Sequence, residues 1–393
     1  MDLNRLRADT PGCAHRIHLD NAGASLMPAP VLAAITDHLE LEARVGGYEA
    51  ETEAAGRIDA AYAAVADLLG TSSGNVAFTE HATAAFVQAL SSVPMRRGDV
   101  VLTTRADYVS NQIQYLSLSE RLGMEVVRAP DAPEGGVDLQ AMEELIHRRR
   151  PRLVAMTHVP ANSGLVQDAA AIGRLCRARD VLYLVDACQS VGQMPVHPES
   201  MGCDFLSVTA RKFLRGPRGA GFLWVSDRAL DAGLSPLFPD LRGADWVEGD
   251  LFQPAPDARR FETWEFAWAL VLGTGAAARY ALEVGLDETR ERVRSLAAGL
   301  RERLPAIPGV RVLDRGAELC AIVTVSVEGW APKDLVVALR ERGINTTGQA
   351  RMDAVLDYDQ KGVEGALRIS PHYFNTHAEL DAILAALGEL AGR

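Results

Sequence analysis

The chain has 393 residues, of which 48% are hydrophobic and 23% are charged, so it can bury a full core and form two domains. Its formal net charge of -12 argues against a nucleic-acid or anionic-membrane surface. No apolar run reaches the roughly 18 residues of a membrane span, and the polar start MDLNRLRADT has no signal-peptide core, so we expect a cytoplasmic location. Five scattered cysteines form no CxxC pair, so we expect neither disulfides nor a metal site.

Short apolar runs alternate with amphipathic helical stretches from about residue 65 to 225, a pattern typical of a parallel sheet flanked by helices. The expected strands are 100–104, 125–129, 152–159, 181–187, 204–210 and 219–225, and the expected helices are 110–123, 139–150 and 168–180. Only RKFLRGPRG joins the last two strands. This is too short for a crossover helix, so we expect the last strand to be antiparallel to its neighbour.

A loop-rich segment, 233–260, follows this unit and precedes an expected long helix over 265–285. The rest of the chain alternates helix and strand with shorter periods, which predicts a second, smaller α+β domain. We predict an α/β protein with a large domain of residues 14–262 and a small domain made of residues 1–13 and 263–393.

Polar side chains gather where three of the expected strands end. They are His158 and Asn162, then Asp186 and Gln189, and finally Thr209, Arg211 and Lys212. Because open α/β sheets bind ligands at the carboxyl ends of their strands, these side chains should share one crevice. Lys212 is one of only three lysines in the chain. A lysine and a carboxylate in such a crevice suit pyridoxal 5'-phosphate, which needs the lysine for its aldehyde and the carboxylate to keep its ring nitrogen protonated.

The stretch VDACQSVGQMPVHPESMGCDFLSVTARKFLRGPRGAGFLWV, residues 185–225, is similar to the cofactor region of class V aminotransferase-like enzymes. These have fold type I of the pyridoxal-phosphate enzymes and include cysteine desulfurases, cysteine-conjugate C–S lyases and isopenicillin N epimerase. The resemblance extends from IHLDNAGAS to LRISPHYFNTHAELD, which is almost the whole chain. It implies pyridoxal phosphate as cofactor, a mostly parallel seven-stranded sheet, an amino-acid substrate and a homodimer with shared active sites.

The resemblance gives the central residues roles toward the cofactor. Lys212 would carry the cofactor covalently and then move the proton at the substrate Cα. Asp186 would pair with the ring nitrogen, and Gln189 would hydrogen-bond the phenolic oxygen. Tyr108 would lie over the cofactor ring, where desulfurases have a histidine. Lys212, Asp186 and Tyr108 are therefore the expected catalytic residues.

The phosphate is expected to bind Thr209 and Arg211, together with Ala82 and Thr83 at a helix N-terminus, which offers free N–H groups to an anion. Arg211 stands where desulfurases commonly have a histidine, and a guanidinium can replace it as a phosphate partner. Asn162 is a further expected contact to the cofactor.

Four more residues are expected to bind substrate. Arg368 matches the arginine that holds a substrate α-carboxylate by a bidentate pair. Asn111 is expected to contact cofactor or substrate, and His372 is expected either to line the substrate site or to support Arg368. Tyr48 lies in a segment that resembles the one reaching the partner subunit's site in these dimers.

Desulfurases that form a persulfide carry a mobile cysteine shortly before that arginine, whereas this chain has no cysteine between residues 321 and 393. Persulfide chemistry of that type is therefore not expected. The leading hypothesis is β-elimination from a cysteine conjugate or its sulfoxide, and VGGYEAE and RISPH are similar to hercynylcysteine sulfoxide lyases.

Epimerisation, transamination and γ-elimination or replacement on a methionine-derived substrate begin at the same site and remain open. A degenerate, non-enzymatic scaffold that binds pyridoxal phosphate or a protein partner is the third reading, and the intact Asp–Gln–Thr–Lys set argues against it.

Overall fold

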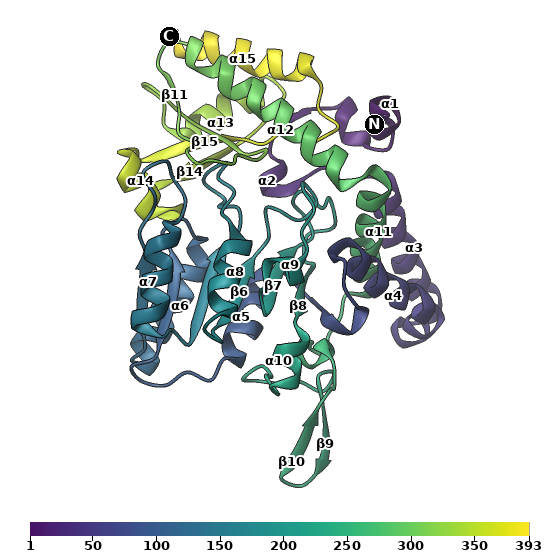
Figure 1. Cartoon of the computed structure of the whole chain (residues 1–393). Coiled ribbons are helices and arrows are strands. Elements are labelled where there is room, and N and C mark those ends of the chain that lie inside the picture. Colours follow the sequence, from purple (N-terminus) through teal and green to yellow (C-terminus); the bar gives the residue numbers. More distant parts are fainter. Residues whose placement is uncertain (393) are drawn as a thin grey trace.

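A seven-stranded sheet forms the centre of the larger part of the molecule (Figure 1) in the order β2-β8-β7-β6-β5-β3-β4. The computed structural model describes residues 1–392. The strands are β2 (Val76–Thr79), β3 (Val100–Thr104), β4 (Glu125–Ala129), β5 (Leu153–Thr157), β6 (Leu182–Asp186), β7 (Phe205–Thr209) and β8 (Gly221–Val225). β8 is antiparallel to both β7 and β2, whereas the pairs from β7 to β4 are parallel. The predicted antiparallel strand is confirmed, and β2 is the strand that the sequence pattern missed.

Both faces of this sheet are buried, which explains why its central strands are apolar runs without alternation. Successive residues of a strand point to opposite faces. Leu184 and Phe205 therefore lie in one apolar core, while Val185 and Leu206 lie in the other. The helices of this part are α5 (Ala82–Ser92), α6 (Val109–Leu122), α7 (Leu139–Arg149), α8 (Ala169–Arg177), α9 (Pro198–Met201) and α10 (Asp227–Asp231). The three predicted helices thus form as α6, α7 and α8.

The smaller part has a four-stranded antiparallel sheet in the order β11-β12-β15-β14. Its strands are β11 (Val310–Val312), β12 (Val323–Val327), β14 (Thr347–Ala350) and β15 (Gly365–Ile369), and its helices are α12 (Leu286–Arg303), α13 (Pro332–Glu341), α14 (Val355–Lys361) and α15 (His377–Ala391). β1 (Ile17–His18) pairs in parallel with β13 (Ile344–Asn345). Strands of this part share a separate apolar core with Leu19, so residues near the N-terminus pack with the C-terminal sheet.

The expected long helix forms as α11 (Trp268–Val284). It packs on α3 (Ala29–Val45) and α4 (Gly47–Leu69), and the contact is close, since a Cβ on Gly275 would lie 2.5 Å from the Cβ of Ala61. The proposed boundary after residue 262 therefore precedes a helix whose buried side chains belong to the core of the larger part. The remaining short helices are α1 (Leu3–Ala8) and α2 (Asn21–Ala24).

A β-hairpin of β9 (Ala244–Glu248) and β10 (Leu251–Pro254) projects away from the rest of the molecule (Figure 1). The sequence predicted only a loop-rich segment here. That prediction missed the hairpin because its strands have exposed apolar residues, so they lack the apolar–polar alternation of a half-buried strand. Trp246 is 80% exposed and Phe252 is 54% exposed. Among helices of residues 1–392, none is long and apolar enough to cross a membrane.

Candidate active site

A cavity of about 370 Å³ lies at the carboxyl ends of β5, β6 and β7. Its walls include these predicted residues: Ala82, Thr83, Tyr108, Asp186, Gln189, Thr209, Arg211 and Lys212. The walls also include His81, Cys188 and Arg218, which the sequence reasoning did not select. The fold thus brings most of the predicted cofactor residues to one crevice, as expected for an open α/β sheet.

Lys212 lies in the turn between β7 and β8, where the Arg215 backbone N donates to the Lys212 carbonyl at 2.8 Å. A Cβ on Gly192 would lie 2.4 Å from the carbonyl carbon of Phe213, so only glycine lets the chain after β6 pack against this turn. Burial lowers the pKa of Lys212; Arg211 and Arg368 lower it further, while Cys188 and Asp186 oppose the shift. A lowered pKa favours the uncharged, nucleophilic amine.

Asp186 ends β6, and its carboxylate accepts hydrogen bonds from one backbone and one side-chain donor. Its Oδ1 accepts a hydrogen bond from the Cys188 backbone N at 2.9 Å, and its Oδ2 accepts one from Asn111 Nδ2 at 3.1 Å. Asn111 is buried in α6 and is not part of the cavity wall. The structure therefore places Asn111 as a support for Asp186 and not at the substrate position that the resemblance implied.

Tyr108 caps the start of α6. Its backbone N donates to Asp107 Oδ1 at 2.7 Å and to Thr157 Oγ1 at 3.1 Å. Its ring centroid lies 5.7 Å from Lys212 Nζ. An aromatic face thus lies beside the amine, on the same cavity.

The N-terminus of α5 provides an anion site at another part of the cavity. His81 is the N-cap, and its Nδ1 accepts from the Ala84 backbone N at 3.0 Å. The helix can approach β8 closely because residue 221 is glycine: a Cβ there would lie 2.9 Å from the Ala82 backbone N. Arg211 donates to the Gly23 carbonyl, and its pKa is lowered by burial and by Arg218.

The hydrogen bonds of Gln189 show whether the cavity walls fit the cofactor. It is 1% exposed and its Nε2 donates to the Ala22 carbonyl at 3.0 Å, but its Oε1 has no hydrogen-bond partner in the described chain. A buried polar atom without a partner is costly, so this amide is expected to bond to a bound molecule. With its amide oxygen and nitrogen exchanged, Gln189 would direct an N–H group to the phenolic oxygen of pyridoxal phosphate. The cavity thus has a lysine, a carboxylate, an aromatic face and an anion site, and this set of residues fits that cofactor.

Arg368 in β15 borders the cavity through its neighbour Ala161, a wall residue. Its Nη1 donates to the Ala161 carbonyl at 3.0 Å, and its Nη2 pairs with Asp20 Oδ1 at 3.3 Å. The third group, Nε, has no partner in the described chain although the residue is buried. Asn162 Nδ2 donates to Asp357 Oδ2 at 2.7 Å, and Asn162 is not among the wall residues.

One predicted substrate contact, His372, is not among the wall residues of the cavity. His372 is fully buried, with Nε2 hydrogen-bonded to the Phe213 carbonyl at 2.8 Å and Nδ1 accepting from the Tyr373 backbone N at 2.8 Å. Both ring nitrogens are therefore engaged within the chain, one of them by the carbonyl next to Lys212, which favours a supporting role over a substrate contact. Tyr48, which is expected at the partner subunit's site, is 72% exposed and lines a separate groove with Trp264 and Glu265. Its role there stays a prediction.

The family model "Aminotransferase class-V" matches residues 17–383. A probable cysteine desulfurase from Xylella fastidiosa (strain Temecula1) is 30% identical over 404 residues, covering 98% of this chain and 95% of that protein. A probable hercynylcysteine sulfoxide lyase from Mycobacterium tuberculosis is 31% identical over 386 residues, covering 98% and 92%. The apo structure of a cysteine desulfurase from Thermococcus onnurineus NA1 is similar with a TM-score of 0.91 at 24% identity, covering 99% of this chain and 98% of that one. This likeness confirms the predicted fold class.

Proposed function

The chain belongs to the aminotransferase class-V family and is a pyridoxal-phosphate enzyme, and from this premise we propose that it cleaves a C–S bond by β-elimination. The proposed substrate is a cysteine conjugate or its sulfoxide. A cysteine S-conjugate and water would give a thiol, pyruvate and ammonium, while a sulfoxide would release a sulfenic acid in place of the thiol. C–S chemistry is named for the desulfurase and sulfoxide-lyase relatives, which supports this reaction class.

The observation that carries the proposal is the meeting of Lys212, Asp186 and Tyr108 on one cavity. The chain has no cysteine after residue 320, which speaks against a persulfide-forming desulfurase. Cys188 does line the cavity, but burial raises the pKa of its thiol and the charge of Asp186 raises it further. A raised thiol pKa disfavours the nucleophilic thiolate, so we do not propose Cys188 in place of the missing cysteine.

Pyridoxal phosphate, when bound, supplies an electron sink that makes the substrate Cα proton acidic. Lys212 is the base that removes this proton, and the lowered pKa of its amine favours the uncharged form that can accept it. Asp186 holds the proton on the ring nitrogen, while Asn111 and the Cys188 backbone N fix the direction of its carboxylate. Arg368 binds the α-carboxylate, because its unpartnered Nε leaves a donor free.

The remaining wall residues would hold the cofactor in place. Thr209, Arg211 and the backbone N–H groups of Ala82 and Thr83 bind its phosphate at the start of α5. The Tyr108 ring, whose centroid lies 5.7 Å from Lys212 Nζ, would offer an aromatic face to the cofactor ring. These contacts orient the Cα–H bond toward the lysine.

The test is the absorbance spectrum of the purified enzyme before and after addition of cysteine S-conjugates, cysteine sulfoxides and S-adenosylmethionine, together with a pyruvate assay. The visible band of the bound cofactor should be present, should be absent in Lys212→Ala, and should change with the substrate that releases pyruvate. Deuterium uptake at Cα without product would favour epimerisation, and a keto acid with the aminated cofactor would favour transamination. A colourless protein would instead favour the non-enzymatic scaffold.

We also propose that the enzyme acts as a homodimer. The β9–β10 hairpin exposes Trp246 and Phe252, and the preceding segment exposes Phe238. Monomers rarely leave such large apolar groups together in water, so a second copy is the proposed occupant. Light scattering after gel filtration should give twice the chain mass, and Trp246→Ser with Phe252→Ser should shift it toward the monomer. A wild-type monomer at micromolar concentration would refute this.

A further inference from the structure

Asp107 is a buried carboxylate, 5% exposed, that the proposed reaction does not use. It directly precedes Tyr108 at the start of α6. Five groups donate to it: Thr157 Oγ1 at 2.6 Å, the Tyr108 backbone N at 2.7 Å, Thr103 Oγ1 and Gln112 Nε2 at 2.9 Å, and Asn111 Nδ2 at 3.2 Å. Because these donors come from β3, β5 and the first turns of α6, both oxygens are held from several directions.

Asn111 links Asp107 to Asp186. The same Nδ2 atom donates to Asp107 Oδ1 at 3.2 Å and to Asp186 Oδ2 at 3.1 Å. Tyr115 lies close enough to both carboxylates to be affected by them: burial raises its pKa, and the charges of Asp107 and Asp186 raise that pKa further. The two negative charges therefore act on the same small volume, and only Asp186 faces the cavity.

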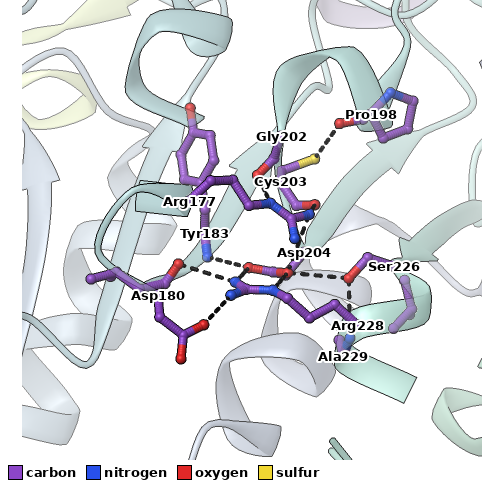
Figure 2. Close-up of polar contacts among 12 residues, drawn as sticks. Arg177, Asp180, Tyr183, Pro198, Gly202, Cys203, Asp204, Ser226, Arg228 and Ala229 are labelled. Atoms are coloured by element: carbon purple, nitrogen blue, oxygen red, sulfur yellow. Dashed lines mark hydrogen bonds and ion pairs between the residues drawn. The ribbon is translucent and has the colours of Figure 1, made fainter. Parts of the chain in front are cut away.

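Two neighbouring buried carboxylates are unfavourable unless a positive charge or many donors compensate them. A third buried carboxylate, Asp204, has such a partner: Arg228 reaches its Oδ1 at 2.8 Å and its Oδ2 at 2.5 Å (Figure 2). Asp107 and Asp186 take part in none of the ion pairs found within residues 1–392. Burial raises the pKa of Asp107, and the hydrogen bonds from Thr157, Gln112, Asn111 and Thr103 oppose this shift. The missing positive charge is expected from the bound molecule.

We propose that Asp107 is a positioning residue that acts through Asn111 on Asp186 and adds its charge to that of Asp186 in holding the proton on the cofactor's ring nitrogen. Its bond to the Tyr108 backbone N also fixes the aromatic ring beside Lys212. This inference rests on the proposed function only in that pyridoxal phosphate is the cofactor, and it is independent of which bond is cleaved.

The test compares two cofactors: pyridoxal phosphate and its analogue in which the ring nitrogen is replaced by C–H. Kd is measured by titrating the full-length apoenzyme with each. Asp107→Asn should weaken pyridoxal phosphate about tenfold, since one pKa unit of lost proton stabilisation corresponds to that factor. The analogue, which has no ring proton, should weaken less than about twofold. Asn111→Ala, which keeps both carboxylates, should show the same preference with a smaller loss.

Asp204→Asn is the matched control, because it neutralises a buried carboxylate at the other end of the same sheet. It should leave the ratio of the two Kd values unchanged. Equal weakening of both cofactors by Asp107→Asn and by Asn111→Ala would mean a purely structural role and would overturn the inference. Failure of the wild-type enzyme to bind either cofactor would overturn both proposals, whereas loss of pyruvate release with the predicted Kd ratio would affect the proposed reaction alone.

Discussion

The seven-stranded sheet buries carboxylates in different ways at the amino ends and at the carboxyl ends of its strands. At one end, Asp204 precedes β7 and is closed by Arg228, the Tyr183 backbone N and Ser226, with Arg177 3.7 Å away (Figure 2). At the other end, Asp107 and Asp186 receive neutral donors, and neither is paired with an arginine or lysine in the described chain. Only Asp186 lines the cavity there. A buried ion pair makes each partner necessary for stability, because removing one leaves the other charge unpaired. Carboxylates without a cationic partner beside a cavity are instead typical of a ligand site.

The largest expected effect is at the cavity end. Lys212→Ala should lower the rate of product formation by about 10²- to 10⁴-fold, the usual contribution of a positioned general base, and should abolish the covalent cofactor band. Folding should be preserved, because the change removes an amine whose burial is itself unfavourable. Steady-state kinetics and the visible spectrum measure both effects, and wild-type turnover by the variant would contradict the assignment.

The next effect is at the Asp204 end and concerns stability. Arg228→Met leaves Asp204 fully buried without its close charge partner, so it should lower the free energy of unfolding by about 3–5 kcal/mol. Urea unfolding measures this loss, and the cofactor spectrum of the folded fraction should stay unchanged. A shifted cofactor spectrum with an unchanged free energy of unfolding would show that Arg228 serves the cofactor site and not stability.

His158, which follows β5 at the cavity end, predicts a dependence on pH. Burial lowers its pKa from 6.5 to about 4. Between these values the unfolded chain binds a proton that the folded chain does not, so stability is lost as pH falls from about 6.5 toward about 4, by up to about 3 kcal/mol. Unfolding free energies at several pH values should show a flatter profile for His158→Gln than for wild type, and parallel profiles would show that other groups dominate.

The smallest expected effect concerns substrate binding. Arg368→Lys keeps the charge but loses the planar pair of donors, so KM should rise about tenfold with a smaller change in kcat. Lys333→Arg, at an exposed position, is the matched control and should change neither constant. A fall in kcat at constant KM would instead place Arg368 in the chemical step.

The residues that sequence reasoning found share one property: each is set by local position at the end of a strand or the start of a helix. Lys212, Asp186 and Gln189 belong to one motif, and the carboxyl ends of parallel strands meet at one edge of a sheet. The sequence therefore determined the fold class, the antiparallel direction of β8 and the meeting of most predicted cofactor residues at one cavity.

Contacts between distant parts of the chain could only come from tertiary structure. Asp107 was missed because it is compensated by Thr157, 50 positions away. The bonds from Asn111 to Asp186 and from His372 to the Phe213 carbonyl are likewise not readable from the sequence. The β9–β10 hairpin was missed because its apolar side chains face outward. Periodicity records which residues are apolar, whereas burial, charge pairing and the direction of each side chain are decided by what packs against them.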